Sequence, residues 1–154
     1  MPTPYVPAGY HCVIPYLAVH DANAAIDFYK RALGAEEVMR FPMPDGRIAH
    51  AELKIGDAHI MLADETPEQK FFGPKKVGGT PVQIMIYVPS VDQTVKSSLA
   101  AGATLHREVA DQFYGDRTGG VTDPFGHKWF IATHVKDVSP EEMKAAMAAM
   151  AQKA

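Results

Sequence analysis

Two stretches of the chain share the same succession of apolar and polar positions. Residues 13–19 (VIPYLAV) and 82–88 (VQIMIYV) are rich in β-branched and aromatic side chains, which predicts strands. After each strand, apolar residues recur at the spacing of an amphipathic helix, and Gly34 or Gly102 follows where a left-handed residue commonly ends a helix. Because the second stretch repeats the first about 70 residues later, the chain is predicted to contain a duplicated unit with one site between its halves.

Shorter patterns complete each half. Around the first apolar stretch we expect a strand, a helix, a second strand and a hairpin, over residues 11–19, 21–33, 36–41 and 47–63. The second half repeats this order with a helix and three strands, over residues 90–101, 104–109, 118–122 and 128–133. Ser139, Pro140 and Glu142 form a clear start for a terminal helix. The order strand–helix–three strands, twice, predicts an α+β fold with helices on one face of mostly antiparallel sheet.

These elements fit one domain over residues 1–154. The length of 154 residues is enough for one core, and the boundaries fall at changes in composition. We expect module one, a polar crossover rich in glycine and proline, module two and a C-terminal helix, at about 10–64, 65–80, 81–135 and 139–152.

Charge and cysteine content exclude several classes of protein. The formal net charge is −3 and the basic residues are scattered, so we expect no nucleic-acid partner. No window is apolar enough to span a bilayer, and residues 1–9 do not resemble a signal peptide, so we expect no membrane partner. The single cysteine, Cys12, allows no internal disulfide and fits a cytoplasmic protein. Cys12 is expected to be a buried residue of the first strand.

Several motifs resemble the vicinal oxygen chelate superfamily, also called the glyoxalase/bleomycin-resistance family. The resemblance rests on Ile26-Asp27-Phe28-Tyr29 before Leu33-Gly34, and on Asp123-Pro124-Phe125-Gly126-His127 before the last strand. Residues 46–51 and 111–117 are similar to the PhnB-like branch. The resemblance implies paired βαβββ modules, an eight-stranded U-shaped trough with helices outside, and a homodimer. The superfamily contains isomerases, dioxygenases, thiol transferases and drug-binding proteins, so fold alone does not give the function.

The resemblance also implies where a divalent metal would be held. Family enzymes use four side chains from the first and last strands of each half, and the matching positions here are Ile14, Met61, Gln83 and Phe130. Isoleucine and phenylalanine have no donor atom, and a thioether suits soft ions. We therefore expect no metal and no other cofactor at these positions.

Strand alternation predicts which other side chains face the trough. The expected lining combines apolar and polar residues, as small-molecule pockets do: His50, Glu52, His59, Met61, Gln83, Met85, Tyr87, Lys128 and Phe130. Tyr114 and Arg117 lie on a turn near one mouth, where they could clamp an anionic or planar ligand. Alternatively, Asp116 and Arg117 form a pair that only orders the turn.

Three functions are compatible with this lining. We favour a metal-free protein that binds a small aromatic or amphipathic molecule through His59, Met61, Gln83, Met85, Tyr114, Arg117, Lys128 and Phe130. The main alternative is a lyase or isomerase acting on a carbonyl compound, with Glu52 as general base and His50 orienting it. A displaced metal site of His50, Glu52 and His59 would be one version of that enzyme. The third is a structural dimer. Met143, Met147 and Met150 are spaced by four and three residues, so they lie on one face of a helix and would form a core or dimer seam.

Overall fold

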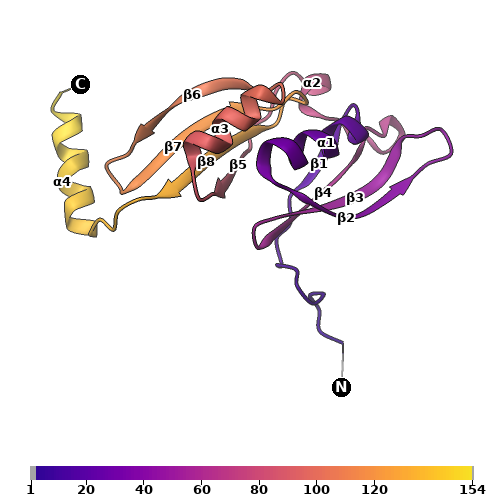
Figure 1. The fold of residues 1–154 in the computed structure, drawn as a ribbon, viewed down its shortest axis with the longest axis horizontal. Coiled ribbons are helices and arrows are strands. Elements are labelled where there is room, and N and C mark those ends of the chain that lie inside the picture. Colours follow the sequence, from indigo (N-terminus) through magenta and orange to yellow (C-terminus); the bar gives the residue numbers. More distant parts are fainter. Residues whose placement is uncertain (1–2, 154) are drawn as a thin grey trace.

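The computed structural model describes residues 3–153, and its eight strands form two four-stranded sheets, one for each half of the chain (Figure 1). In the first sheet the order is β1-β4-β3-β2; its strands are Tyr16–Val19 (β1), Ala58–Asp64 (β4), Ile48–Ile55 (β3) and Glu36–Pro42 (β2). Strands β1 and β4 are parallel and the other neighbours are antiparallel. Helix α1 (Ala22–Leu33) joins β1 to β2.

The second sheet repeats this topology, in the order β5-β8-β7-β6. Its strands are Gln83–Tyr87 (β5), Lys128–His134 (β8), Asp116–Thr122 (β7) and Thr104–Asp111 (β6). Helix α3 (Val91–Ala100) joins β5 to β6, and β5 runs parallel to β8. The duplicated unit and the α+β class are therefore confirmed.

The sequence signals at the helix ends act as expected. The Asp21 carboxylate accepts a hydrogen bond from Ala24 N at 2.9 Å, and the Ser90 hydroxyl caps α3 in the same way. Gly34 ends α1 at φ 66°, a left-handed conformation that favours glycine.

A buried carboxylate connects the two halves. Helices α1 and α3 pack against each other, and Tyr29 of α1 donates its hydroxyl to Asp123 Oδ2 at 2.7 Å. Trp129 Nε1 donates to the same oxygen at 2.9 Å, while the backbone amides of Phe125 and His127 donate to Oδ1. Each oxygen of the buried Asp123 carboxylate thus accepts two hydrogen bonds. Since the donors come from both halves of the chain, these bonds hold the two halves together.

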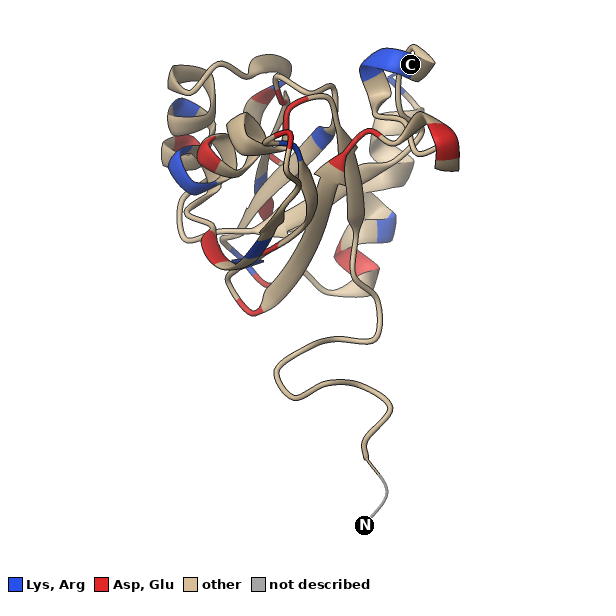
Figure 2. Ribbon diagram, turned by 90° about the vertical axis from the view of Figure 1, so that its right-hand side faces the viewer, with Lys and Arg blue, Asp and Glu red and all other residues tan. Residues whose placement is uncertain are grey.

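Two expectations about the first strand are wrong. Strand β1 begins at Tyr16 rather than residue 11, because Pro15 has no amide hydrogen and only its carbonyl joins the ladder, accepting from Met61 N. Residues 3–14 instead form an arm that extends away from the sheets (Figure 2). Cys12 lies on this arm and is exposed, not buried.

The crossover and the C-terminus add short elements. The crossover contains a 3₁₀ turn, Pro67–Gln69, and helix α2 (Pro74–Val77), where the sequence predicts a loop. Helix α4 (Pro140–Ala151) begins with the expected capping box of Ser139 and Glu142 and buries none of its residues. It stands apart from the second sheet in Figure 1. Within residues 3–153, no helix has the length and apolarity needed to cross a bilayer.

Candidate functional site

A groove of about 560 Å³ lies between the two sheets, flanked by their edge strands β1 and β5. Its lining includes Ile14, Tyr16, Val82, Gln83, Met85 and Lys128. Three of the residues expected to bind a ligand (Gln83, Met85 and Lys128) therefore meet in one place, beside side chains from the first half. The walls are mainly apolar with a few polar groups, which is the ordinary composition of a small-molecule site.

The four positions that the family resemblance implies for a metal do not offer a set of metal ligands. Ile14 and Gln83 line the groove, Met61 pairs with Tyr16 across β1 and β4, and Phe130 pairs with Met85 across β5 and β8. Only Gln83 among the four positions offers an oxygen donor. Over residues 3–153, no group of three or more His, Cys, Asp or Glu side chains is arranged to hold an ion. The donor set does not fit the metal that the fold family implies.

A chain of hydrogen bonds occupies the open face of the first sheet, opposite α1. His50 Nε2 donates to the Glu52 carboxylate, with Oε1 3.0 Å away, and His50 Nδ1 lies 2.6 Å from the Tyr16 hydroxyl. The Tyr10 hydroxyl, from the N-terminal arm, donates to the second oxygen of Glu52. His59 lies on the neighbouring strand β4, and its ring is stacked on Tyr10 at a centroid distance of 4.1 Å. The structure thus brings His50 and Glu52 together, as predicted, and adds both tyrosines.

This cluster makes Glu52 an acceptor rather than a strong base. Only 7% of Glu52 is exposed, and burial by itself would raise its pKa. The hydrogen bonds from His50 and Tyr10 outweigh burial, so the pKa of Glu52 is lowered. The same contact with Glu52, together with burial, raises the pKa of the Tyr10 phenol. The cluster is therefore a carboxylate held by hydrogen bonds from His50 and Tyr10.

The open face of the second sheet is basic. The Arg107 guanidinium lies 5.0 Å from the centre of the Phe130 ring, a cation–π contact, and Lys128 lies nearby at the groove. Burial and these two cations lower the pKa of His106. Gly120 makes the arrangement possible, because a Cβ there would lie 2.5 Å from His106 Nε2 and 3.1 Å from Arg107 Cβ. In the described part of the chain, neither Arg107 nor Lys128 forms an ion pair.

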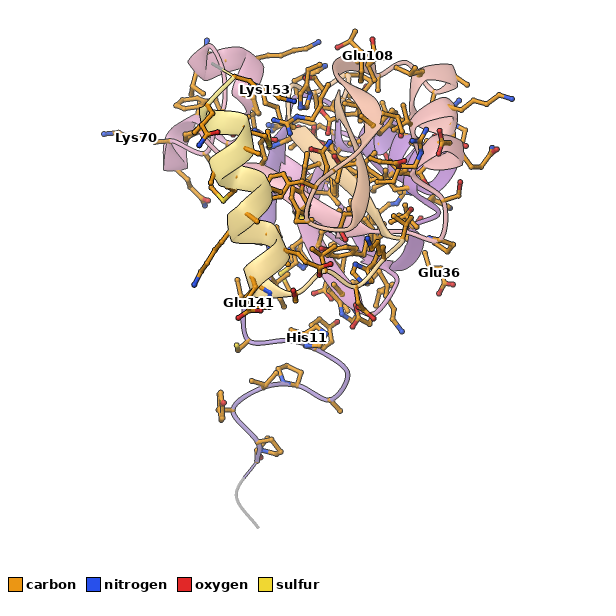
Figure 3. All side chains as sticks on the ribbon, turned by 90° about the vertical axis from the view of Figure 1, so that its left-hand side faces the viewer. His11, Glu36, Lys70, Glu108, Glu141 and Lys153 are labelled. Carbon is orange, nitrogen blue, oxygen red and sulfur yellow. The ribbon has the colours of Figure 1, made fainter. Side chains whose placement is uncertain are left out.

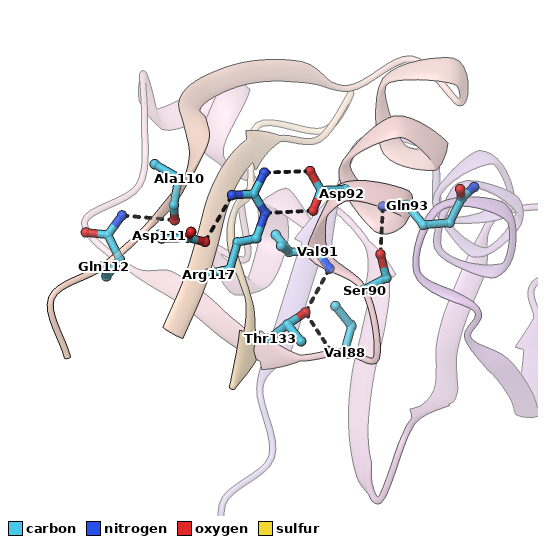
Figure 4. Close-up of polar contacts among 10 residues, drawn as sticks. All are labelled: Val88, Ser90, Val91, Asp92, Gln93, Ala110, Asp111, Gln112, Arg117 and Thr133. Atoms are coloured by element: carbon cyan, nitrogen blue, oxygen red, sulfur yellow. Dashed lines mark hydrogen bonds and ion pairs between the residues drawn. The ribbon is translucent and has the colours of Figure 1, made fainter. Parts of the chain in front are cut away.

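Arg117 lies elsewhere. Its Nε and Nη2 donate to both oxygens of Asp92 on α3, at 2.8 and 2.9 Å, and its Nη1 donates to Asp111 at 3.0 Å (Figure 4). These bonds raise the pKa of Arg117 and hold its side chain on the helix-covered side of the sheet. Tyr114 stays on the preceding turn, half-buried against Phe113. The structure therefore does not bring Arg117 to the groove, and the ordering role for it fits the geometry better.

The start of β7, next to Arg117, has a different polar cluster. Asp116 Oδ2 accepts from the Tyr87 hydroxyl at 2.8 Å, and Asp116 Oδ1 lies 2.7 Å from His134 Nδ1. His134 Nε2 lies 2.9 Å from Asp137 Oδ1. Because both ring nitrogens face carboxylates, the Asp116 and Asp137 contacts raise the pKa of His134. The cluster ties the end of β8 to the segment that leads into α4.

Sequence reasoning missed Tyr10 and Arg107. Tyr10 lies on an arm with no strand or helix periodicity, so no pattern could place it. Arg107 was hidden by a register shift between Leu105 and Arg107 in β6, which breaks simple alternation. The one available signal was Gly120 inside a predicted strand, since glycine there often marks the close approach of another group.

Comparison with known proteins agrees with this architecture. Residues 10–131 match the Glyoxalase/Bleomycin resistance protein/Dioxygenase superfamily, and the chain belongs to that superfamily. Its structure is similar to that of TioX from Micromonospora sp. ML1, with a TM-score of 0.62 and 26% identity over 80% of this chain and 98% of TioX. A PhnB protein from Bacillus cereus shares the fold, with a TM-score of 0.60 and 13% identity over 80% of this chain and 99% of that one.

A relative from Mycobacterium tuberculosis, the uncharacterized protein Rv0887c, is more similar in sequence. It is 45% identical over 136 residues, which cover 86% of this chain and 80% of that protein. The protein YjdN of Escherichia coli is 26% identical over 76% of this chain and 91% of its own length. The expected family is confirmed, and neither name specifies a ligand.

Proposed function

We propose that this protein binds a small aromatic or amphipathic molecule, without a metal, in the groove between β1 and β5. The observation that carries the proposal is the pairing of apolar groove walls with cations that lack a carboxylate partner in residues 3–153. Lys128 borders the groove, and Arg107 lies on Phe130 beside it. An apolar body would pack against Ile14 and Met85, and an anionic group would pair with Lys128 and Arg107.

An enzyme that uses Glu52 as a general base is the weaker candidate. A base needs a pKa near the working pH, and the pKa of Glu52 is lowered. Both of its oxygens also accept hydrogen bonds already, from His50 and Tyr10. If the protein turned over a carbonyl substrate and Glu52→Gln abolished that activity, the enzyme would become the better-supported function.

The binding proposal can be tested by isothermal titration with benzoate, 4-phenylbutyrate and 2-naphthoate, and with the matching neutral amides. Lys128→Met and Arg107→Met should each weaken binding of a carboxylate about tenfold or more, because each removes a charge-assisted contact. The amides should bind both variants as they bind the parent protein. Arg117→Met is the matched control: it removes a cation of the same sheet that the structure places away from the groove. Equal affinities for all variants, or no binding by any probe, would refute the proposal.

We also propose that the protein is a homodimer in which α4 packs against a second copy. A helix of 12 residues has little stability by itself, and α4 buries none of its residues in the single chain. Met143, Met147 and Met150 nevertheless form one apolar stripe along it, and a two-fold axis would let the stripe pack against itself. Light scattering should give a dimer for the parent protein and for Lys144→Glu, and a monomer for Met147→Glu. A monomeric parent protein would refute the proposal.

A further inference from the structure

The N-terminal arm contributes one aromatic side chain to the open face of the first sheet. Most of the arm is exposed, and 96% of Tyr5 is accessible to solvent. Tyr10 instead stacks on His59, at 4.1 Å between centroids and 14° between planes, and donates its hydroxyl to Glu52. Figure 3 shows His11 where the arm reaches the rest of the chain, and His11 Nε2 lies 3.0 Å from the carbonyl of Asp57.

The surface under Tyr10 has polar atoms that need a partner. With Tyr10 in place, 7% of Glu52 and 7% of His59 is exposed. Among residues 3–153, His59 Nδ1 has no hydrogen-bond partner, and without Tyr10 the second oxygen of Glu52 would lose the donor that it has. The contacts of Tyr10 show what this surface accepts: a flat ring that stacks on His59 and a hydroxyl that donates to Glu52.

We propose that Tyr10 holds the place of a ligand, and that the surface formed by His50, Glu52 and His59 is a subsite for a neutral hydroxylated aromatic ring. A carboxylate ligand would be repelled by Glu52, whereas a phenol donates to it as Tyr10 does. The ring of such a ligand would stack on His59. The subsite adjoins the groove through Tyr16, which contacts His50 and also lines the groove. The inference rests on the proposed function only for the idea that this face of the protein binds small molecules.

Few contacts hold residues 3–12 of the arm to the first sheet. Cys12 and Val13, which follow Tyr10 and His11, are exposed, and the hydrogen bonds and ring stacking between this part of the arm and the sheet involve Tyr10 and His11. Displacing Tyr10 would therefore leave Ile14 at the groove. Because Tyr10 is tethered, it competes with a free ligand at a high effective concentration. The arm would therefore lower the apparent affinity of the subsite for phenols until a ligand displaces it.

The free side-chain analogue of tyrosine, p-cresol, provides the test. In a ¹H–¹⁵N NMR titration, p-cresol should bind Tyr10→Ala at least tenfold more tightly than it binds the parent protein, with shifts at residues 50, 52 and 59. Toluene, which lacks the hydroxyl, should bind Tyr10→Ala at least tenfold more weakly than p-cresol. Adding Glu52→Gln to Tyr10→Ala should remove most of that preference for p-cresol over toluene. Tyr5→Ala is the matched control on the same arm and should behave as the parent protein.

Three results would overturn the inference: equal affinity of p-cresol for Tyr10→Ala and the parent protein, no p-cresol binding by Tyr10→Ala, or equal binding of toluene. Thermal unfolding of each variant checks that it is folded. Titrating benzoate into the same samples separates the two proposals. Benzoate binding without p-cresol binding would refute the subsite alone, and the reverse result would refute the proposed groove ligand alone.

Discussion

Replacing Tyr29 by phenylalanine would remove one buried hydrogen bond between the two halves and leave the ring in place. Tyr29 is fully buried, and its hydroxyl donates to the Asp123 carboxylate at 2.7 Å. Burial and the charge of Asp123 raise the pKa of this phenol well above its usual value, so it is a neutral donor at every working pH. A hydrogen bond to a charged group contributes about 1.5–3 kcal/mol, so Tyr29→Phe should lower the free energy of unfolding by about 2 kcal/mol.

For a chain of this length that loss corresponds to a fall in Tm of about 4–8 °C. Urea unfolding followed by circular dichroism would measure the free energy, and the m-value should not change because the same surface is exposed on unfolding. Tyr5→Phe is the matched control, since Tyr5 lies on the arm and is almost fully exposed. A loss below about 0.5 kcal/mol for Tyr29→Phe would refute the reasoning that Asp123 connects the halves.

Two further predictions concern the turn next to β7. The Asp116 carboxylate raises the pKa of His134 above 6.5, so the contact stabilises the fold fully below pH 6.5 and is lost as the pH rises through the raised value. Thermal unfolding from about pH 5 to pH 9 should show this loss in the parent protein and not in His134→Gln, and identical profiles would contradict it. A Cβ on Gly115 would lie 1.9 Å from the Lys136 carbonyl oxygen at φ +97°, whereas one on Gly46, at φ +87°, has no atom within 4 Å. By urea unfolding, Gly46→Ala should cost about 1 kcal/mol and Gly115→Ala more than twice that, and equal costs would contradict the argument.

The fold could be predicted because its signals are local and repeated. Asp21, Ser90 and Ser139 act as helix caps in the structure as in the prediction, and Gly34 ends α1. The start of β1 was mispredicted because residues 11–14 have strand-like composition. Whether such residues join a sheet depends on a partner strand, and the ladder of β4 begins beside Pro15.

The candidate site was predicted where it depends on strand alternation and missed where it depends on tertiary packing. His50 and Glu52 share one strand face, so their contact could be foreseen. The Arg117 side chain points to the face of β7 that α3 covers, away from the groove. Its pairing with Asp92 could not be predicted without knowing that α3 packs on that face. Tyr10 reached Glu52 from 42 positions away along an irregular arm, which no periodic pattern could reveal.

The repeated unit gives this protein two four-stranded sheets of the same topology, and a perfectly repeated site would accept a molecule in either of two opposite orientations. The halves have diverged: the first offers the Glu52 anion, and the second offers the Arg107 and Lys128 cations. If both proposed sites bind as described, an elongated molecule with a hydroxyl at one end and an acid at the other would bind in a single direction. The two sheets thus keep the same strand order, while the charges on their open faces differ.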